Sequence, residues 1–202
     1  MREGTRARNP MPFEPINLAW PARLWLTNLR YKWSRIRHRN SIKTMSREDT
    51  LRFKPYIPKT INDVRDTARE INSRFQWTMD SWDRLYDSID SPASCWSRAF
   101  NNPPLLDDCD GFHSALYWAV SFYMKCRLLT VATKEISQSH SVLVIKFMNT
   151  YYLVNYTYVS RPLPSMDAVL KDLDRQHYRG NMNMIAWELS KWNGEYWESG
   201  SL

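Results

Sequence analysis

The stretch LLDDCDGFHSALYWAV, residues 105–120, joins a cluster of acids to a run of apolar residues. Its apolar side chains recur every three or four positions, which is the spacing of a helix that turns one face to a core. Asp107 or Asp108 suits the N-cap, because an Asp side chain accepts hydrogen bonds from the amides of the first helical turn. The sequence therefore predicts a helix from Cys109 to about Met124, with Cys109 in or just before its first turn.

Cys109 has two interpretations at this place in the chain. The amides and the dipole of a helix N-terminus stabilise a thiolate, as a reactive cysteine requires. The neighbouring carboxylates of Asp107, Asp108 and Asp110 act against a thiolate. The alternative is a small buried cysteine that only packs the helix end, and the stretch taken by itself favours that packing role slightly.

The composition predicts one compact domain with an extension. The 202 residues include three cysteines without regular spacing, so neither a disulfide framework nor a Cys-x-x-Cys zinc site is expected. The acids near Cys109 show no ligand pattern, and the chain lacks glycine-rich phosphate-binding motifs, so we expect no metal and no cofactor. There is no apolar run of membrane-span length and no secretory signal. We therefore expect a cytoplasmic protein, with a virion component as the alternative.

Charge divides the chain into two parts. Residues 1–54 hold 13 Lys and Arg against 4 Asp and Glu, whereas residues 55–202 are nearly neutral. Residues 22–36 add a Trp and Leu stripe at helical spacing, which predicts a basic amphipathic helix inside a basic N-terminal arm. We rank docking of this arm on a protein assembly, such as a phage particle, above binding to an anionic membrane or to nucleic acid.

The remaining periodicities predict an α+β fold. A period of two before and after a turn at residues 148–150 indicates an antiparallel hairpin. The expected elements are helices over 60–75, 94–100 and 165–174, strands over 128–133, 139–147 and 151–158, and a helix or strand over 181–192.

A cysteine nucleophile needs a base and a third group that orients the base. His140 begins the first hairpin strand, and Asn155 lies on the partner strand, so the hairpin brings them side by side with the Asn155 oxygen accepting from Nδ1–H. If the predicted helix packs its first turn against this sheet, Cys109, His140 and Asn155 form a catalytic triad. His113 is the alternative base, since it lies one turn along the helix from Cys109, but we expect it to pack or hydrogen-bond near the site.

This ordered set resembles the transglutaminase-like superfamily of cysteine peptidases, a branch of the papain-like fold. The similarity is closest to the bacterial transglutaminase-like cysteine proteinases. It rests on INSRFQWTMDSWDRLYDSIDSP, DDCDGFHSAL, SHSVLVIKF and YYLVNYT, and it spans about residues 60–170. The resemblance implies a papain-like core over residues 55–202, in which N-terminal helices and the cysteine helix pack on an antiparallel sheet.

Two residues depart from the family pattern. Asp107 stands where the family usually has Gly, and Asn155 replaces the commoner Asp. The acid that usually follows the cysteine is kept as Asp110, and Gly111 comes next. An amide at position 155 still orients a histidine, although it stabilises an imidazolium less than a carboxylate does.

The chemistry that the resemblance implies is acyl transfer. The Cys109 thiolate attacks a carbonyl, and His140 activates the thiol and then protonates the leaving amine. The backbone N–H of Cys109 and a second donor, for which Gln76 and Trp96 are the candidates, meet the oxyanion. We expect a peptidase or amidase that acts on a protein or peptide. The alternatives are a module that kept the fold for binding or assembly, and a nucleic-acid-binding protein that uses the basic arm.

Overall fold

The computed structural model describes residues 52, 56–78, 91–134, 138–194, 197–199 and 201–202. The basic arm, residues 1–54, lies outside the described residues except for Arg52, and so does its predicted helix over 22–36. The division of the chain into an arm and a domain therefore stays a prediction. In the described part of the chain, no helix is both long enough and apolar enough to cross a membrane.

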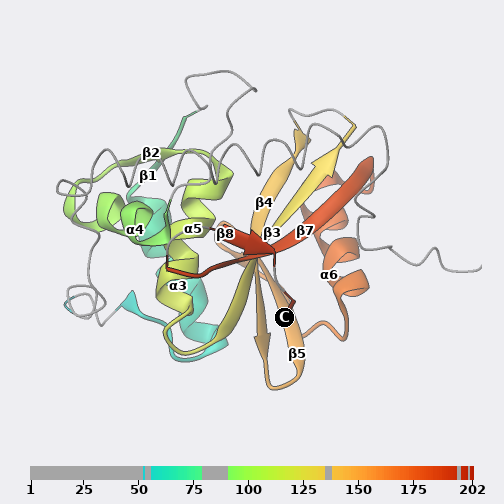
Figure 1. Ribbon diagram of the computed structural model, residues 1–202, viewed down its shortest axis with the longest axis horizontal. Helices are drawn as coiled ribbons and strands as arrows, with labels where there is room; N and C mark the ends of the chain where they lie inside the picture. Colours follow the sequence, from blue (N-terminus) through green and yellow to red (C-terminus); the bar gives the residue numbers. More distant parts are fainter. Residues whose placement is uncertain (1–51, 53–55, 79–90, 135–137, 195–196, 200) are drawn as a thin grey trace, which may run out of the picture.

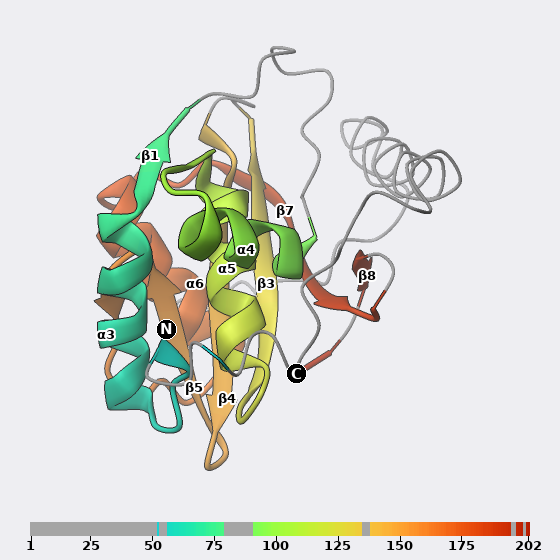
Figure 2. The same ribbon diagram turned by 90° about the vertical axis from the view of Figure 1, so that its left-hand side faces the viewer.

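The predicted α+β class is confirmed. An antiparallel sheet has the strand order β6-β5-β4-β3-β7-β8, with α3, α4 and α5 on one face and α6 on the other (Figures 1 and 2). The strands are β3 Lys125–Thr133, β4 His140–Phe147, β5 Thr150–Asn155, β6 Tyr158–Val159, β7 Met184–Trp192 and β8 Trp197–Ser199. The helices are α3 Ile61–Ser73, α4 Pro92–Asn101, α5 Cys109–Val120 and α6 Met166–Leu173.

The sheet separates two apolar cores. Leu143 and Ile145 of β4 pack with the residues of α3, α4 and α5, whereas Val142 and Val144 pack with α6. Successive side chains of a strand point to opposite faces, so a strand covered on both faces is apolar at nearly every position. This arrangement explains why SVLVI reads as a continuous apolar run.

Helix α5 is the central helix of the molecule. It begins at Cys109 as predicted, but it ends at Val120 rather than near Met124. The prediction that it turns a single face to a core is too narrow, because residues 110–117 are all buried. The helix contacts α4 and α3 on one side and strands β4 and β3 on the other, so little of its surface meets water (Figure 2).

The predicted hairpin is confirmed, and its turn is built from two residues. Met148 and Asn149 have φ angles of 49° and 62°, and positive φ at both central residues is the requirement of a type I′ turn. The partner strand is shorter than predicted, because β5 ends at Asn155 and Tyr156 adopts a φ of 50°. That left-handed residue interrupts the ladder before β6 resumes at Tyr158.

The other helices start close to the expected positions. Thr60 caps α3 through a capping box with Asp63, and Ser91 caps α4, which therefore begins a little earlier than predicted. Ser165 caps α6, and the ambiguous segment over 181–192 is the strand β7.

A second, smaller sheet was not predicted. Strand β1, Phe75–Trp77, pairs in parallel with β2, Leu105–Asp107. Each strand has only three residues, which is too short for a periodic pattern to identify. This pair positions the segment that leads directly into Cys109.

Candidate active site

Cys109 lies at the first position of α5, with its side chain half-buried. Asp108 is the N-cap, and its Oδ1 accepts from the backbone N–H of Asp110 at 2.9 Å. Of the two capping candidates the structure therefore selects Asp108. The start of a helix presents amides and a positive dipole end to the thiol, which favours its ionised form.

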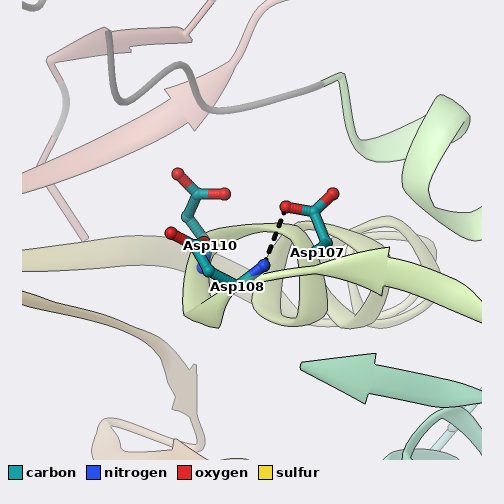
Figure 3. A group of neighbouring side chains, drawn as sticks. All are labelled: Asp107, Asp108 and Asp110. Atoms are coloured by element: carbon teal, nitrogen blue, oxygen red, sulfur yellow. Dashed lines mark hydrogen bonds between the residues drawn. The ribbon is translucent and has the colours of Figure 1, made fainter. Parts of the chain in front are cut away.

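The acids around Cys109 are more closely grouped than their sequence pattern indicated. Oxygen atoms of Asp107, Asp108 and Asp110 all lie within 4.8 Å of one another (Figure 3). Asp107 accepts from the N–H of Asp108 at 3.0 Å and pairs with the Arg98 guanidinium at 2.7 Å. Capping of α5 and pairing with Arg98 account for the positions of the Asp107 and Asp108 carboxylates.

Gly111 makes room for the side chain of Asp107. A Cβ atom on Gly111 would lie 2.0 Å from Cγ of Asp107. The Asp107 side chain therefore occupies the space beside Gly111, and the two residues form a matched pair. This pairing explains how α5 accommodates a carboxylate at position 107.

The structure brings His140 and Asn155 together as predicted. The ring nitrogen that meets Oδ1 of Asn155, at 2.9 Å, is Nε2 and not the predicted Nδ1. An amide oxygen only accepts, so Nε2 carries the proton. In the part of the chain that the structure describes, Nδ1 has no hydrogen-bond partner, so this tautomer leaves an unprotonated nitrogen that can act as a base.

Cys109 lies at the same end of β4 as His140. The backbone N–H of Ser141, the residue after His140, donates to Sγ of Cys109 at 3.5 Å. A donor on the sulfur stabilises a thiolate more than a thiol. The three residues of the predicted triad therefore converge at one end of the sheet, contributed by α5, β4 and β5.

Burial keeps His140 neutral. Its side chain is almost fully buried, and desolvation is the largest cause that lowers its pKa to about 3. Nearby His177 and His113 lower the pKa further, whereas the bond to Asn155 raises it. At neutral pH the His140 imidazole is therefore uncharged.

His113 has the structural role that we expected. The Tyr156 N–H donates to its Nε2 at 3.0 Å, so Nδ1 carries the proton and donates to the Cys109 carbonyl at 2.5 Å. Burial lowers the His113 pKa to about 4. This neutral imidazole joins the first turn of α5 to the residue that follows Asn155.

Sequence reasoning missed His177. It lies on η4, Asp174–Tyr178, a π-helix that continues α6, and its ring stacks on that of His140 with centroids 3.9 Å apart. No periodicity indicates this contact, because it joins segments far apart in the chain. The local sequence indicates only where the helix ends: Arg179 and Gly180, which follow Tyr178, take positive φ angles.

The two candidates for a second oxyanion donor lie in different places. Trp96 is fully buried in α4 and stacks on Phe100 with centroids 4.1 Å apart, so it belongs to the core. Gln76 is exposed on β1 and pairs in register with Leu106, three residues before Cys109. Its position leaves Gln76 as the better candidate.

The other two cysteines pack in the interior. Cys95 and Cys126 are buried, and all three cysteines, which lie within the described part of the chain, carry reduced thiols. Burial raises the pKa of the Cys126 thiol. Cys109, which is half-buried, is therefore the most accessible thiol of the three.

Comparison of the chain with known family models, with curated proteins and with solved structures found no match.

Proposed function

We propose that this protein is a cysteine-dependent acyl-transfer enzyme, a peptidase or amidase that acts on a protein or peptide. Cys109 is the nucleophile, His140 is the general base and acid, and Asn155 holds the imidazole. The observation that carries the proposal is the bond of 2.9 Å between His140 Nε2 and Asn155 Oδ1, at the point where β4 meets the thiol of Cys109.

The acylation step follows from this arrangement. The Cys109 thiol gives its proton to Nδ1 of His140 as Sγ forms a bond to the carbonyl carbon. The tetrahedral intermediate then collapses, the C–N bond breaks, and the imidazolium returns its proton to the leaving amine. A thioester remains on Cys109.

Deacylation runs the same proton path in reverse. His140 takes a proton from water as the water oxygen attacks the thioester, and the released Cys109 sulfur recovers a proton. A lysine amine in place of water would give a crosslink instead of hydrolysis. The backbone N–H of Cys109, together with Gln76, would stabilise the oxyanion in both steps.

Electrostatics favour concerted proton transfer over a resting ion pair. The pKa of His140 is lowered by burial, so an imidazolium without a thiolate beside it is unfavourable. Pairing of Asp107 with Arg98 supports the nucleophile, because a neutralised carboxylate opposes the thiolate less. The Ser141 N–H adds a donor to the sulfur.

We further propose a distant relationship to the transglutaminase-like cysteine peptidases. The support is the order in which the elements occur: a central helix that begins with Cys109, a strand that begins with His140, and the antiparallel partner strand that ends with Asn155. The departure at position 107 is compensated within the chain by the space at Gly111.

The reactivity of the three thiols tests the proposal. The folded protein is treated with iodoacetamide from pH 5 to pH 9, and mass spectrometry follows modification of each cysteine. Wild type and His140→Ala are compared, and the buried thiols Cys95 and Cys126 serve as internal controls. Below the ordinary thiol pKa of about 8.5 we expect Cys109 to react faster than a free thiol, because His140 takes its proton as the sulfur attacks, and we expect His140→Ala to slow it strongly.

A Cys109 that reacts like an ordinary thiol, with no dependence on His140, contradicts the proposal. The fold would then serve binding or assembly, and the basic arm, residues 1–54, would be the place to look for a partner. An activated Cys109 justifies a screen of peptide and amide substrates. Formation of a free acid shows hydrolysis, and formation of a new amide with an added amine shows transfer.

A further inference from the structure

His177 forms a close parallel stack on the proposed catalytic base. The His177 and His140 ring centroids lie 3.9 Å apart, and the ring planes differ by 3°. His177 is exposed to solvent, whereas the His140 ring is buried between η4 on one side and α5 on the other. One face of the base is therefore covered by a second imidazole that meets water.

Hydrogen bonds fix both ends of the π-helix that carries His177. The Tyr178 hydroxyl donates to the Gln138 carbonyl at 2.8 Å, which fastens η4 to the segment that leads into β4. Asp174 accepts from the Met182 N–H at 2.9 Å, and this bond holds the other end of the π-helix. π-Helices occur frequently at functional sites, and this one directs His177 over His140.

We propose that His177 is a positioning residue of the Cys109–His140–Asn155 site: its neutral ring holds the plane of His140, and its protonation suppresses activation of the thiol. The inference rests on the proposed function of that site. The physical reason is that proton transfer from Cys109 turns His140 into a cation, and a second cation in the stack opposes this charge.

His177 is the neighbour that changes charge in the relevant range. Desolvation lowers the pKa of His177, but this ring is exposed to water, whereas the buried rings of His113 and His140 have pKa values of about 4 and about 3. As the pH falls, His177 therefore takes a proton before the two buried imidazoles do.

The other groups around the stack are accounted for. His113 and Tyr156 face His140 with ring centroids 6.0 and 5.9 Å away, and Tyr178 packs edge-on against His177. Burial raises the pKa of both tyrosines, so they stay neutral while His177 titrates. The Cys109 thiol and the carboxylates of Asp108, Asp110 and Asp174 act on the two phenols, and on η4 itself the Arg175 guanidinium pairs with Asp172.

The test compares two substitutions that separate stacking from charge. His177→Phe keeps an aromatic ring over His140 but cannot be protonated, and His177→Ala removes both properties. Gln176→Ala, an exposed neighbour on the same π-helix, is the control. The readout is the ratio of the Cys109 iodoacetamide rates at pH 5 and pH 8, together with an NMR titration of the His140 ring.

We expect His177→Phe to raise this ratio by about threefold to tenfold and to raise the His140 pKa by about half a unit to one unit. His177→Ala should lower the Cys109 rate at pH 8 by about threefold or more, because the His140 plane is less well held. Gln176→Ala should keep the wild-type ratio. A His177→Phe protein with the wild-type ratio and the wild-type His140 titration overturns the inference.

The two proposals fail in different ways. If His140→Ala leaves Cys109 reactivity unchanged, the proposed function fails, and the NMR titration still shows whether His177 and His140 are coupled. If Cys109 is activated, but the fall in its alkylation rate at low pH is the same with and without His177, only the further inference fails. His177→Gln is a second variant that cannot be protonated. If neither His177→Phe nor His177→Gln folds, the wild-type protein still gives a test. A His140 ring resonance that does not change as His177 titrates overturns the inference.

Discussion

The first turn of α5 and the open end of the β4–β5 hairpin each bury one imidazole, and the two rings lie 6.0 Å apart. His113, in α5, has both nitrogens bonded to backbone groups, those of Cys109 and Tyr156. His140, in the hairpin, has Nε2 bonded to Asn155, while Nδ1 has no hydrogen-bond partner among the residues that the structure describes.

The difference between these regions shows what separates the histidine that we propose as the base from the structural one. Burial lowers the pKa of both rings, so a shifted pKa does not separate them. The hydrogen bonds separate the two rings. A ring with two backbone partners holds segments together, whereas a ring with one partner has a nitrogen left for proton transfer. Substitutions at the two positions should therefore affect different properties.

The largest expected effect is on thiol reactivity. His140→Ala should slow Cys109 alkylation near neutral pH by about 10²–10⁴-fold, the usual contribution of a positioned base. His113→Gln should change the rate by less than about tenfold, because the amide keeps a donor and an acceptor for the two backbone groups. Rates come from mass spectrometry of the Cys109 peptide; equal losses in the two variants would contradict the assignment of His140 as the base.

The second expected effect is on stability at acid pH. The His113 pKa is about 4 in the folded protein, below the ordinary value of about 6.5, so the unfolded chain binds a proton first as the pH falls. This group contributes stability that is fully present above pH 6.5 and is lost progressively down to about pH 4. The loss amounts to about 3 kcal/mol.

Urea unfolding at several pH values measures this loss. His113→Gln is the matched variant, since it does not titrate, and its free energy of unfolding should fall less between pH 6.5 and pH 4 than that of wild type. The His140 contribution is common to both proteins and cancels in the comparison. Parallel curves for the two proteins would show that His113 is not buried as a neutral ring.

The third prediction concerns the first turn of α5 alone. Gly111→Ala should destabilise the protein by about 1–3 kcal/mol, because the new Cβ displaces the Asp107 carboxylate from its partners. In an Asp107→Gly background the same change should cost much less, since Ala is the better helix former. A double-mutant cycle by urea unfolding measures this coupling, and additive effects would contradict the matched pair.

The smallest expected effect is at the orienting residue. Asn155→Asp places a carboxylate against Nε2 of His140 and should raise the His140 pKa by about one to three units. Cys109 reactivity at neutral pH should change only severalfold, because the base keeps its place. NMR titration of the ring checks the shift, with Asn155→Ala as the control that removes the bond; an unchanged His140 pKa would show that position 155 does not contact it.

Local patterns determined a large part of this protein. The alternation over residues 139–147, the short turn at Met148 and Asn149 and the capping acid Asp108 each act within a few residues, so the sequence alone predicted the hairpin and the helix that begins at Cys109. The order of Cys109, His140 and Asn155 on those elements then predicted their convergence.

Tertiary structure decided the features that depend on distant segments. Only packing selects Nε2 as the His140 atom that meets Asn155, pairs β1 with β2, buries α5 on nearly all sides and stacks His177 on His140. These contacts join residues 15 or more positions apart, and each is set by how whole elements fit together. Sequence periodicity reports which face of an element is apolar, but the identity of its distant neighbour is a property of the assembled fold.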